Sequence, residues 1–141
     1  MTNLQTIILK TLTNDEEYCR KALPHIKAEY FEDEHGPVYQ LILKFLQAYN
    51  KLPNSSALEV EFQKSDYINR SNRNDIHNLI VDLKNHEEVE REWLLNSTEE
   101  WCKQRAVYLA IIKSIGIIDG KDENLTDGAI PGILSNALSV S

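Results

Sequence analysis

The chain has 141 residues, of which 42% are apolar and 26% charged, and its formal net charge is −7. This length suits one domain with a real core, and the composition is typical of a soluble globular protein. No apolar stretch approaches the roughly 18 residues of a membrane span, and no basic segment precedes an apolar one at the N-terminus, so we expect a cytosolic protein without membrane contact. The acidic balance also disfavours tracking of a nucleic-acid backbone, because phosphate contacts need clustered Lys and Arg.

Amphipathic segments begin the chain. Apolar residues at helical spacing predict a first helix over about Leu4–Leu12. Thr13 and Glu16 then form the pattern of a capping box, in which Thr13 caps a second helix that ends near Pro24. The aromatic segment Glu29–Phe31 is expected to form a single turn whose aromatic side chains pack into the core.

The clearest core helix is predicted over Val38–Tyr49. Its expected buried stripe consists of Tyr39, Ile42, Leu43, Leu46 and Tyr49. Ser56 and Glu59 form a second capping box, which begins a short helix. A further helix is predicted over Asp75–Lys84. Its inward residues are Ile76, Leu79, Ile80 and Leu83.

The last third of the chain predicts a helical hairpin. The stretch Glu87–Ile118 has no proline and ends in apolar residues at helical spacing, and Gly120 is suited to stop it. A third capping box at Ser97 leaves two starts open, because the long helix either begins there or runs continuously from about residue 87. A polar link over Lys121–Asp127 leads to a short amphipathic helix within Gly128–Val140.

We find no strand pattern and no internal repeat, so the fold is predicted to be all-α. A small globular bundle of about five helices should occupy residues 1–86. A long helix and a short one, forming an antiparallel helical hairpin, should occupy residues 87–141 of the same compact domain.

Residues with the potential for chemistry are scattered. The glycines form no phosphate-binding loop, and no serine nucleophile elbow is present. Glu32 and His35 have the spacing of a di-iron motif, but the motif occurs once and directly precedes Gly36-Pro37, which favours an exposed acidic turn. Cys19 and Cys102 lack paired spacing and are expected to be free buried thiols. We therefore predict no catalytic, cofactor-binding or metal site.

Short pieces along nearly the whole chain carry a family resemblance. They are Glu29-Tyr-Phe31, Leu52-Pro53 with Ala57-Leu58 and Val60, Gln104-Arg-Ala106, Gly128-Ala-Ile-Pro131, and Ala137-Leu-Ser139 with Ser141. In their order and spacing, the chain resembles the N-terminal domain of DnaB-like hexameric replicative helicases, most closely that of T-even-type bacteriophages. That domain is itself a small helical bundle followed by a helical hairpin.

The resemblance implies a role in DNA replication. In such helicases this domain forms a collar above the motor ring, where hairpins of sibling subunits pair and where primase, and in some systems a helicase loader, docks. ATP, Mg²⁺ and most DNA contacts belong to a C-terminal motor domain. The chain itself would thus be no enzyme and would hold no cofactor. It would contact DNA weakly or not at all. If it is encoded by a phage, it would act in the cytoplasm of the bacterial host.

The hairpin face is the hypothesised pairing surface. Its residues are Tyr108, Ile111, Ile112, Ile115, Ile133, Leu134 and Leu138. Alternatively, these side chains only close the hairpin on its own globular domain. Both interpretations stay open from the sequence.

Two other functions remain as alternatives. The first is a free-standing helical adaptor or regulator that binds another protein through Trp93, Trp101 and the hairpin. Two tryptophans eight residues apart favour core or interface packing over a ligand cage. The second is an enzyme built on Glu32 and His35, which would require bound metal. A coding sequence that continues past Ser141 into a motor with a phosphate-binding loop would favour the collar.

Overall fold

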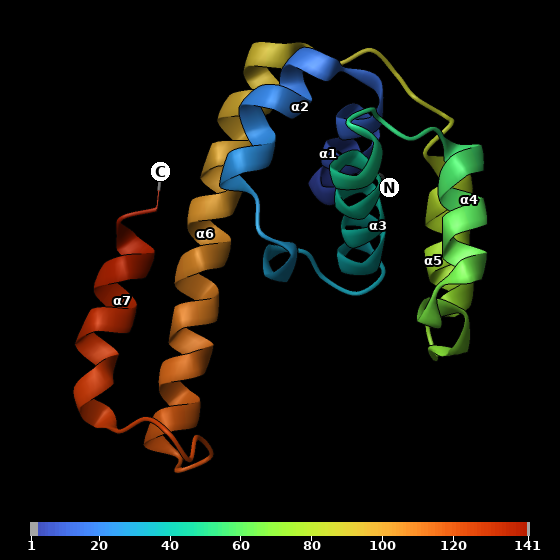
Figure 1. The fold of residues 1–141 in the computed structure, drawn as a ribbon. Coiled ribbons are helices and arrows are strands. Elements are labelled where there is room, and N and C mark those ends of the chain that lie inside the picture. The colour runs from blue at the N-terminus through green and yellow to red at the C-terminus, as the bar shows by residue number, and fades with distance from the viewer. Residues whose placement is uncertain (1–2, 141) are drawn as a thin grey trace. The chain divides into compact units, whose positions relative to one another are not determined.

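The computed structural model describes residues 3–140, except for the side chain of Ile68. All regular elements in this range are helical, which confirms the predicted all-α fold (Figure 1). The α-helices are α1 (Leu4–Asn14), α2 (Glu16–Ala22), α3 (His35–Tyr49), α4 (Ser55–Lys64), α5 (Arg73–Asp82), α6 (Arg91–Ile118) and α7 (Ile130–Leu138). The short 3-10 turns are η1 (Leu23–His25), η2 (Ala28–Tyr30), η3 (Asp66–Asn69) and η4 (Asp127–Ala129). Ser141, the last residue of the resemblance, lies outside the described residues.

The chain divides into two compact units, Met1–Leu95 and Asn96–Ser141. The first unit contains the helices α1–α5 and the first turn of α6, and the second contains the rest of α6 together with α7. Residues 86 and 87, between which we predicted the bundle to give way to the hairpin, lie in the segment between α5 and α6.

The core of the first unit is built from apolar faces of α1, α3, α4 and α5. Helix α1 packs on α2 and α3, while α5 packs on α3 and α4. The fully buried aliphatic side chains are Ile8, Leu9, Leu12, Val38, Ile42, Leu58, Ile76, Ile80 and, from the first turn of α6, Leu94. Each contributes about 1.5–3 kcal/mol relative to an exposed position. The predicted inward face of α5 is confirmed, because Ile76, Leu79 and Ile80 are buried, as is Leu83, which directly follows the helix.

The turn η2 places two aromatic side chains in this core, as predicted. Tyr30 and Phe31 are buried, and the Phe31 ring centroid lies 4.9 Å from that of Tyr39 on α3. The Tyr39 hydroxyl donates a hydrogen bond to the Ile26 carbonyl at 3.2 Å, which satisfies its buried polar atom.

Helices α2 and α4 begin at acidic or amide caps. The Asp15 carboxylate accepts a hydrogen bond of 3.0 Å from the backbone N–H of Tyr18, and the Asn54 side chain accepts one of 2.8 Å from Ala57. Short Asp and Asn side chains reach the third N–H of a helix well and satisfy donors that would otherwise lack partners.

The three predicted capping boxes are wrong. Thr13 lies inside α1 and donates its hydroxyl to the Lys10 carbonyl at 2.9 Å, and Ser56 is already the second residue of α4. Ser97 lies inside α6, which runs continuously from Arg91 and so begins at neither of the two predicted starts. The Ser/Thr-x-x-Glu pattern fails here because a better cap stands within two residues of it or because the helix passes straight through it.

Three large apolar side chains of the first unit are exposed, and one of them, Tyr49, was predicted to lie in a buried stripe. Tyr49 is 60% exposed because the buried part of α3 ends at Ile42, and Val60 on α4 is 54% exposed. Trp93 is 51% exposed whereas Trp101 is buried. Eight residues turn an α-helix by roughly 80° beyond two full turns, so the two indoles leave α6 in different directions.

The second unit is the predicted antiparallel hairpin, in which α7 returns beside α6 (Figure 1). Gly120 ends α6 with a φ of +72°, and its N–H donates to the Ile117 carbonyl at 3.1 Å. The N–H of Lys121 donates to the Gly116 carbonyl at 2.9 Å. This pair of bonds is the Schellman motif, which confirms Gly120 as the stop. None of the described helices combines the length and apolar character needed to cross a membrane.

Candidate protein-interaction surface

One side of α6 in the second unit exposes large apolar side chains. We call it the α6 apolar face, and it consists of Tyr108, Ile111, Ile112, Ile115 and Ile118. These side chains are 47–65% exposed, although isoleucine is among the residues most often buried. Their spacing of three and four residues places them on one stripe of the helix. Four were predicted as pairing residues, and Ile118, three residues beyond Ile115, was missed although its spacing continues the pattern.

The buried side of the same part of α6 is made mostly of small residues. It consists of Ala106, Ala110, Ser114 and Ile117. At 100° per residue this side points roughly 140° away from the α6 apolar face. The buried Ser114 hydroxyl donates to the Ala110 carbonyl at 2.7 Å, so it needs no partner from another element. Along this part of α6 the small side chains and Ile117 are therefore buried, while the other large apolar side chains named above are exposed.

Helix α7 contributes less to the exposed surface. Of the three predicted residues on it, Leu138 is 73% exposed, while Ile133 and Leu134 are half-buried. Ala137 is the buried residue of α7. The seven predicted residues thus separate into five exposed side chains and two half-buried ones.

The α6 apolar face carries almost no charge. Lys113 is the sole charged residue between positions 106 and 118. At the N-terminal edge, the Arg105 guanidinium carbon lies 4.8 Å from the centroid of the Tyr108 ring, a cation–π distance. A contiguous exposed apolar stripe with a charged edge is typical of a protein-interaction site.

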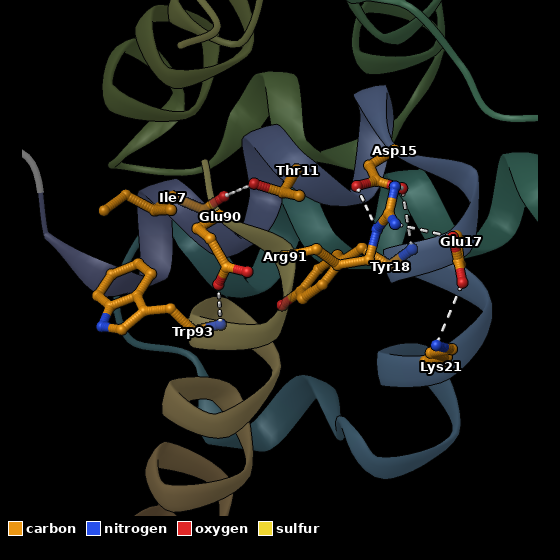
Figure 2. Close-up of polar contacts among 9 residues, drawn as sticks. All are labelled: Ile7, Thr11, Asp15, Glu17, Tyr18, Lys21, Glu90, Arg91 and Trp93. Carbon is orange, nitrogen blue, oxygen red and sulfur yellow. Dashed lines mark hydrogen bonds and ion pairs between the residues drawn. The ribbon is translucent and has the colours of Figure 1, made fainter. Parts of the chain in front are cut away.

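An ion-pair cluster holds the first turn of α6 to α2 in the first unit (Figure 2). Arg91 Nε and Nη2 donate to the two Asp15 carboxylate oxygens at 2.9 and 3.2 Å, and Arg91 Nη1 lies 2.8 Å from Glu17 Oε2. Glu17 also pairs with Lys21 at 3.2 Å. Glu90 accepts a hydrogen bond from the Trp93 backbone N–H and so caps α6.

These contacts change the acidity of the carboxyl groups. Partial burial alone would raise the pKa of Asp15, but the hydrogen bonds from Arg91 and from the Tyr18 backbone, together with the Arg91 charge, lower it overall. The hydrogen bond from Lys21 and the charge of Arg91 lower the pKa of Glu17. Both groups are therefore held ionised, as the cluster requires.

Glu32 and His35 serve structural contacts. The Gln5 amide donates to Glu32 Oε1 at 2.9 Å and also accepts from the Glu32 backbone N–H at 2.9 Å. His35 is buried, and its Nε2 lies 2.9 Å from Thr6 Oγ1. Across residues 3–140, no group of three His, Cys, Asp or Glu side chains is arranged to hold a metal ion.

The two cysteines are free and buried, as predicted. Burial, with a smaller effect of the Glu99 charge, raises the pKa of the Cys102 thiol to about 11, and burial likewise raises the pKa of Cys19. A thiol of this kind reacts slowly, because the thiolate is the nucleophile.

Comparison with known proteins finds similarity to a phage helicase. No protein-family model matches the chain. The chain is 32% identical over 146 aligned positions to a DnaB-like replicative helicase of Enterobacteria phage T4. The alignment covers 96% of this chain and 30% of that helicase, so the chain spans less than a third of the relative's length. The predicted resemblance is thereby confirmed, and the chain is similar along nearly all its length to part of such a helicase.

Proposed function

We propose that this chain, being similar to part of a DnaB-like replicative helicase, is the N-terminal collar domain of such an enzyme. Its role is that of a protein-interaction module, which pairs helicase subunits and offers a docking surface to primase and, in systems that use one, to a helicase loader. ATP and Mg²⁺ belong to a separate motor domain, and the collar itself catalyses nothing. The match along 96% of the chain supports its assignment to part of a DnaB-like helicase.

The exposed α6 apolar face is the observation that carries the pairing role. A second copy of the chain would cover five large apolar side chains that are 47–65% exposed, so each would gain roughly half of the about 1.5–3 kcal/mol that burial from full exposure contributes. Association also costs at least about 4 kcal/mol of rigid-body freedom, and a stable interface covers about 800 Å² on each partner. One helical stripe supplies part of that area. We therefore expect weak pairing by the chain alone and stronger pairing in a ring, where several contacts act together.

Sedimentation velocity of the 141-residue chain, from about 10 μM to about 1 mM, tests this role. We expect a reversible shift from monomer to dimer or trimer with concentration. Ile112→Asp places a carboxylate at the centre of the α6 apolar face and should weaken association at least tenfold, because the interface would have to bury an unpaired charge.

Val60→Asp is the matched control for this substitution. Val60 is an equally exposed aliphatic residue on α4 in the first unit, so the variant makes the same change in charge on a different helix. It should associate like the parent chain. A chain that stays monomeric to 1 mM, or one that pairs equally well as Ile112→Asp, would rule out pairing through this face.

Titration calorimetry with the cognate primase tests the docking role. Heat that saturates at one defined stoichiometry, unchanged in ADP or ATP, supports a collar that acts without nucleotide. The proposal also requires the gene to continue into a motor with a phosphate-binding loop. A gene without that motor, together with a chain indifferent to primase, would favour the free-standing adaptor.

A further inference from the structure

A second candidate surface lies in the first unit, between the C-terminal half of α3 and the end of α4. A hollow of about 140 Å³ opens there. Its lining comes from five residues of α3, Leu41, Lys44, Phe45, Ala48 and Tyr49, and from Glu61, Lys64 and Ser65 at the end of α4. Leu41 is buried, whereas Tyr49 is one of the most exposed aromatic side chains among the described residues. The surface shares no residue with the α6 apolar face.

The size of the hollow sets the kind of group that fits. Cavities of about 150 Å³ accept a molecule as large as benzene, whereas pockets for drug-sized ligands measure about 300–1,000 Å³. The Phe45 and Tyr49 ring centroids lie 4.8 Å apart with their planes tilted by 50°, so the two rings form a corner. One leucine-sized or aromatic side chain would therefore fit, and a whole small-molecule ligand would not.

The rim has a charge opposite to that of the chain. Lys44 is exposed, makes no ion pair with a described residue, and is the sole Lys, Arg, Asp or Glu of α3. Lys64 is 68% exposed at its side chain and lies 3.9 Å from Glu61, the outer limit of an ion pair. Such a contact contributes little and can be exchanged for another carboxylate. Two ammonium groups and one carboxylate, that of Glu61, thus line the hollow, which gives it a local excess of positive charge on a chain of net charge −7.

We propose that this hollow binds a short acidic peptide segment of a partner protein. The segment inserts one apolar side chain, aromatic or leucine-sized, at the corner formed by Phe45 and Tyr49. Carboxylates flanking that side chain pair with Lys44 and Lys64. Opposite charges fix the orientation and speed the encounter, while the buried side chain supplies most of the affinity.

Single-stranded nucleic acid fits this surface less well. Sequence-tolerant binding of single strands needs a positive groove that follows several phosphates and ring faces on which bases stack one after another. Here two lysines stand near Glu61, and the two rings are inclined to each other. A peptide with a single apolar anchor matches both the volume and the charges.

The test is a titration of the ¹⁵N-labelled chain followed by NMR. The probe is the peptide acetyl-Glu-Asp-Phe-Asp-Glu-amide, added to about 2 mM, because one anchor with two exposed ion pairs gives a Kd on the order of 0.1–1 mM. We expect amide shifts centred on residues 41–49 and 61–65. Replacing Phe by Ala in the peptide, or its carboxylates by amides, should weaken binding at least fivefold in each case.

Two charge-reversal variants complete the test. Lys44→Glu should weaken binding at least tenfold, because it turns an attraction into a repulsion. Lys103→Glu makes the same change at an exposed lysine of α6 and should leave the Kd unchanged. Since Lys44 is exposed, its variant should keep the spectrum of a folded chain.

Three outcomes would overturn the proposal. They are an absence of shifts at residues 41–49 and 61–65, equal binding by Lys44→Glu, and stronger shifts of the same amides by an oligothymidine than by the peptide. None of these depends on subunit pairing, so this inference and the collar proposal can fail separately.

Discussion

Arg91 donates two hydrogen bonds, of 2.9 and 3.2 Å, to the carboxylate of Asp15 (Figure 2). Arg91 is the first residue of α6, and Asp15 is the residue that caps α2. Asp15 thus serves two elements at once, since one of its oxygens also accepts the Tyr18 N–H at 3.0 Å. The fork geometry of guanidinium and carboxylate gives such pairs directional specificity. Residues 76 positions apart in the sequence are joined in this way.

Replacement of Asp15 should separate its two roles. Asp15→Ala removes both the helix cap and the ion pair, and loss of the cap alone lowers the free energy of unfolding by about 1 kcal/mol. Asp15→Asn keeps a good capping residue and removes only the negative charge that pairs with Arg91. It should therefore lower the free energy of unfolding by less than Asp15→Ala does. Urea unfolding at neutral pH measures both variants. Equal losses would mean that the cap contributes nothing measurable.

The difference in stability between the parent chain and Asp15→Asn should depend on pH. Because folding lowers the pKa of Asp15, the folded chain holds this proton less tightly than the unfolded chain does. The stabilisation is therefore complete above the ordinary aspartate pKa of about 4 and is lost as pH falls through the lowered value. Thermal unfolding midpoints from about pH 7 to about pH 2 should converge for the two proteins at the acidic end. A constant difference throughout would contradict the lowered pKa.

A pair of substitutions in α4 tests which residue caps it. Asn54→Ala should lower the free energy of unfolding by about 1 kcal/mol, because the Ala57 N–H loses its acceptor. Ser56→Ala should cost almost nothing or be slightly stabilising, because Ser56 lies inside the helix, where alanine is favoured. Chemical unfolding monitored by circular dichroism compares them. A larger loss for Ser56→Ala would restore the capping box expected from the sequence.

Two Gly→Ala substitutions in the hairpin should have opposite effects. Gly120 has a φ of +72°, so Gly120→Ala strains the backbone and should destabilise the chain by about 1 kcal/mol. Gly132 lies within α7 with no atom within 4 Å of an added Cβ. Gly132→Ala should therefore stabilise it by about 0.5–1 kcal/mol. Amide hydrogen exchange of α7 reports both, and effects of the same sign would contradict the assigned backbone conformations.

The buried cysteines should be nearly inert to thiol reagents. With a pKa of about 11, only about one Cys102 thiol in a thousand is ionised at pH 8, so its labelling should be at least about 100-fold slower than in the denatured chain. Cys102→Ser and Cys19→Ser assign the two rates. Raised thiol pKa values also mean that stability falls as pH rises above about 8.5, where only the unfolded chain loses these protons. Rapid labelling of the folded chain would contradict the burial of these thiols.

Periodicity alone located most helices of this protein. The inward face of α5, the aromatic turn at Tyr30 and Phe31, and the stop at Gly120 are all confirmed. These features depend on short-range rules, because helical spacing, an acceptable φ and a local hydrogen bond each involve residues within a few positions of one another. Cap positions were less predictable, since Ser, Thr, Asn and Asp all compete for the same role within a span of two residues.

Burial along α3 and α6 could not be derived in this way. Tyr49 and Trp93 have the size and spacing of core residues and are nevertheless exposed. Along residues 106–118 of α6 the buried residues are mostly small, such as Ala106 and Ala110, so a search for large apolar side chains found the opposite side of the helix. That side remains the hypothesised pairing surface.

The sequence by itself determined that the protein is all-α, where most of its helices lie, and that it resembles a replicative helicase. Each of these rests on local pattern or on residue identity. Only the tertiary structure decided that Tyr108, Ile111, Ile112 and Ile115 are exposed, and that Lys44 and Lys64 border a hollow beside Phe45 and Tyr49. Exposure is a property of what lies next to a side chain, and residues distant in sequence become neighbours only when the chain has packed.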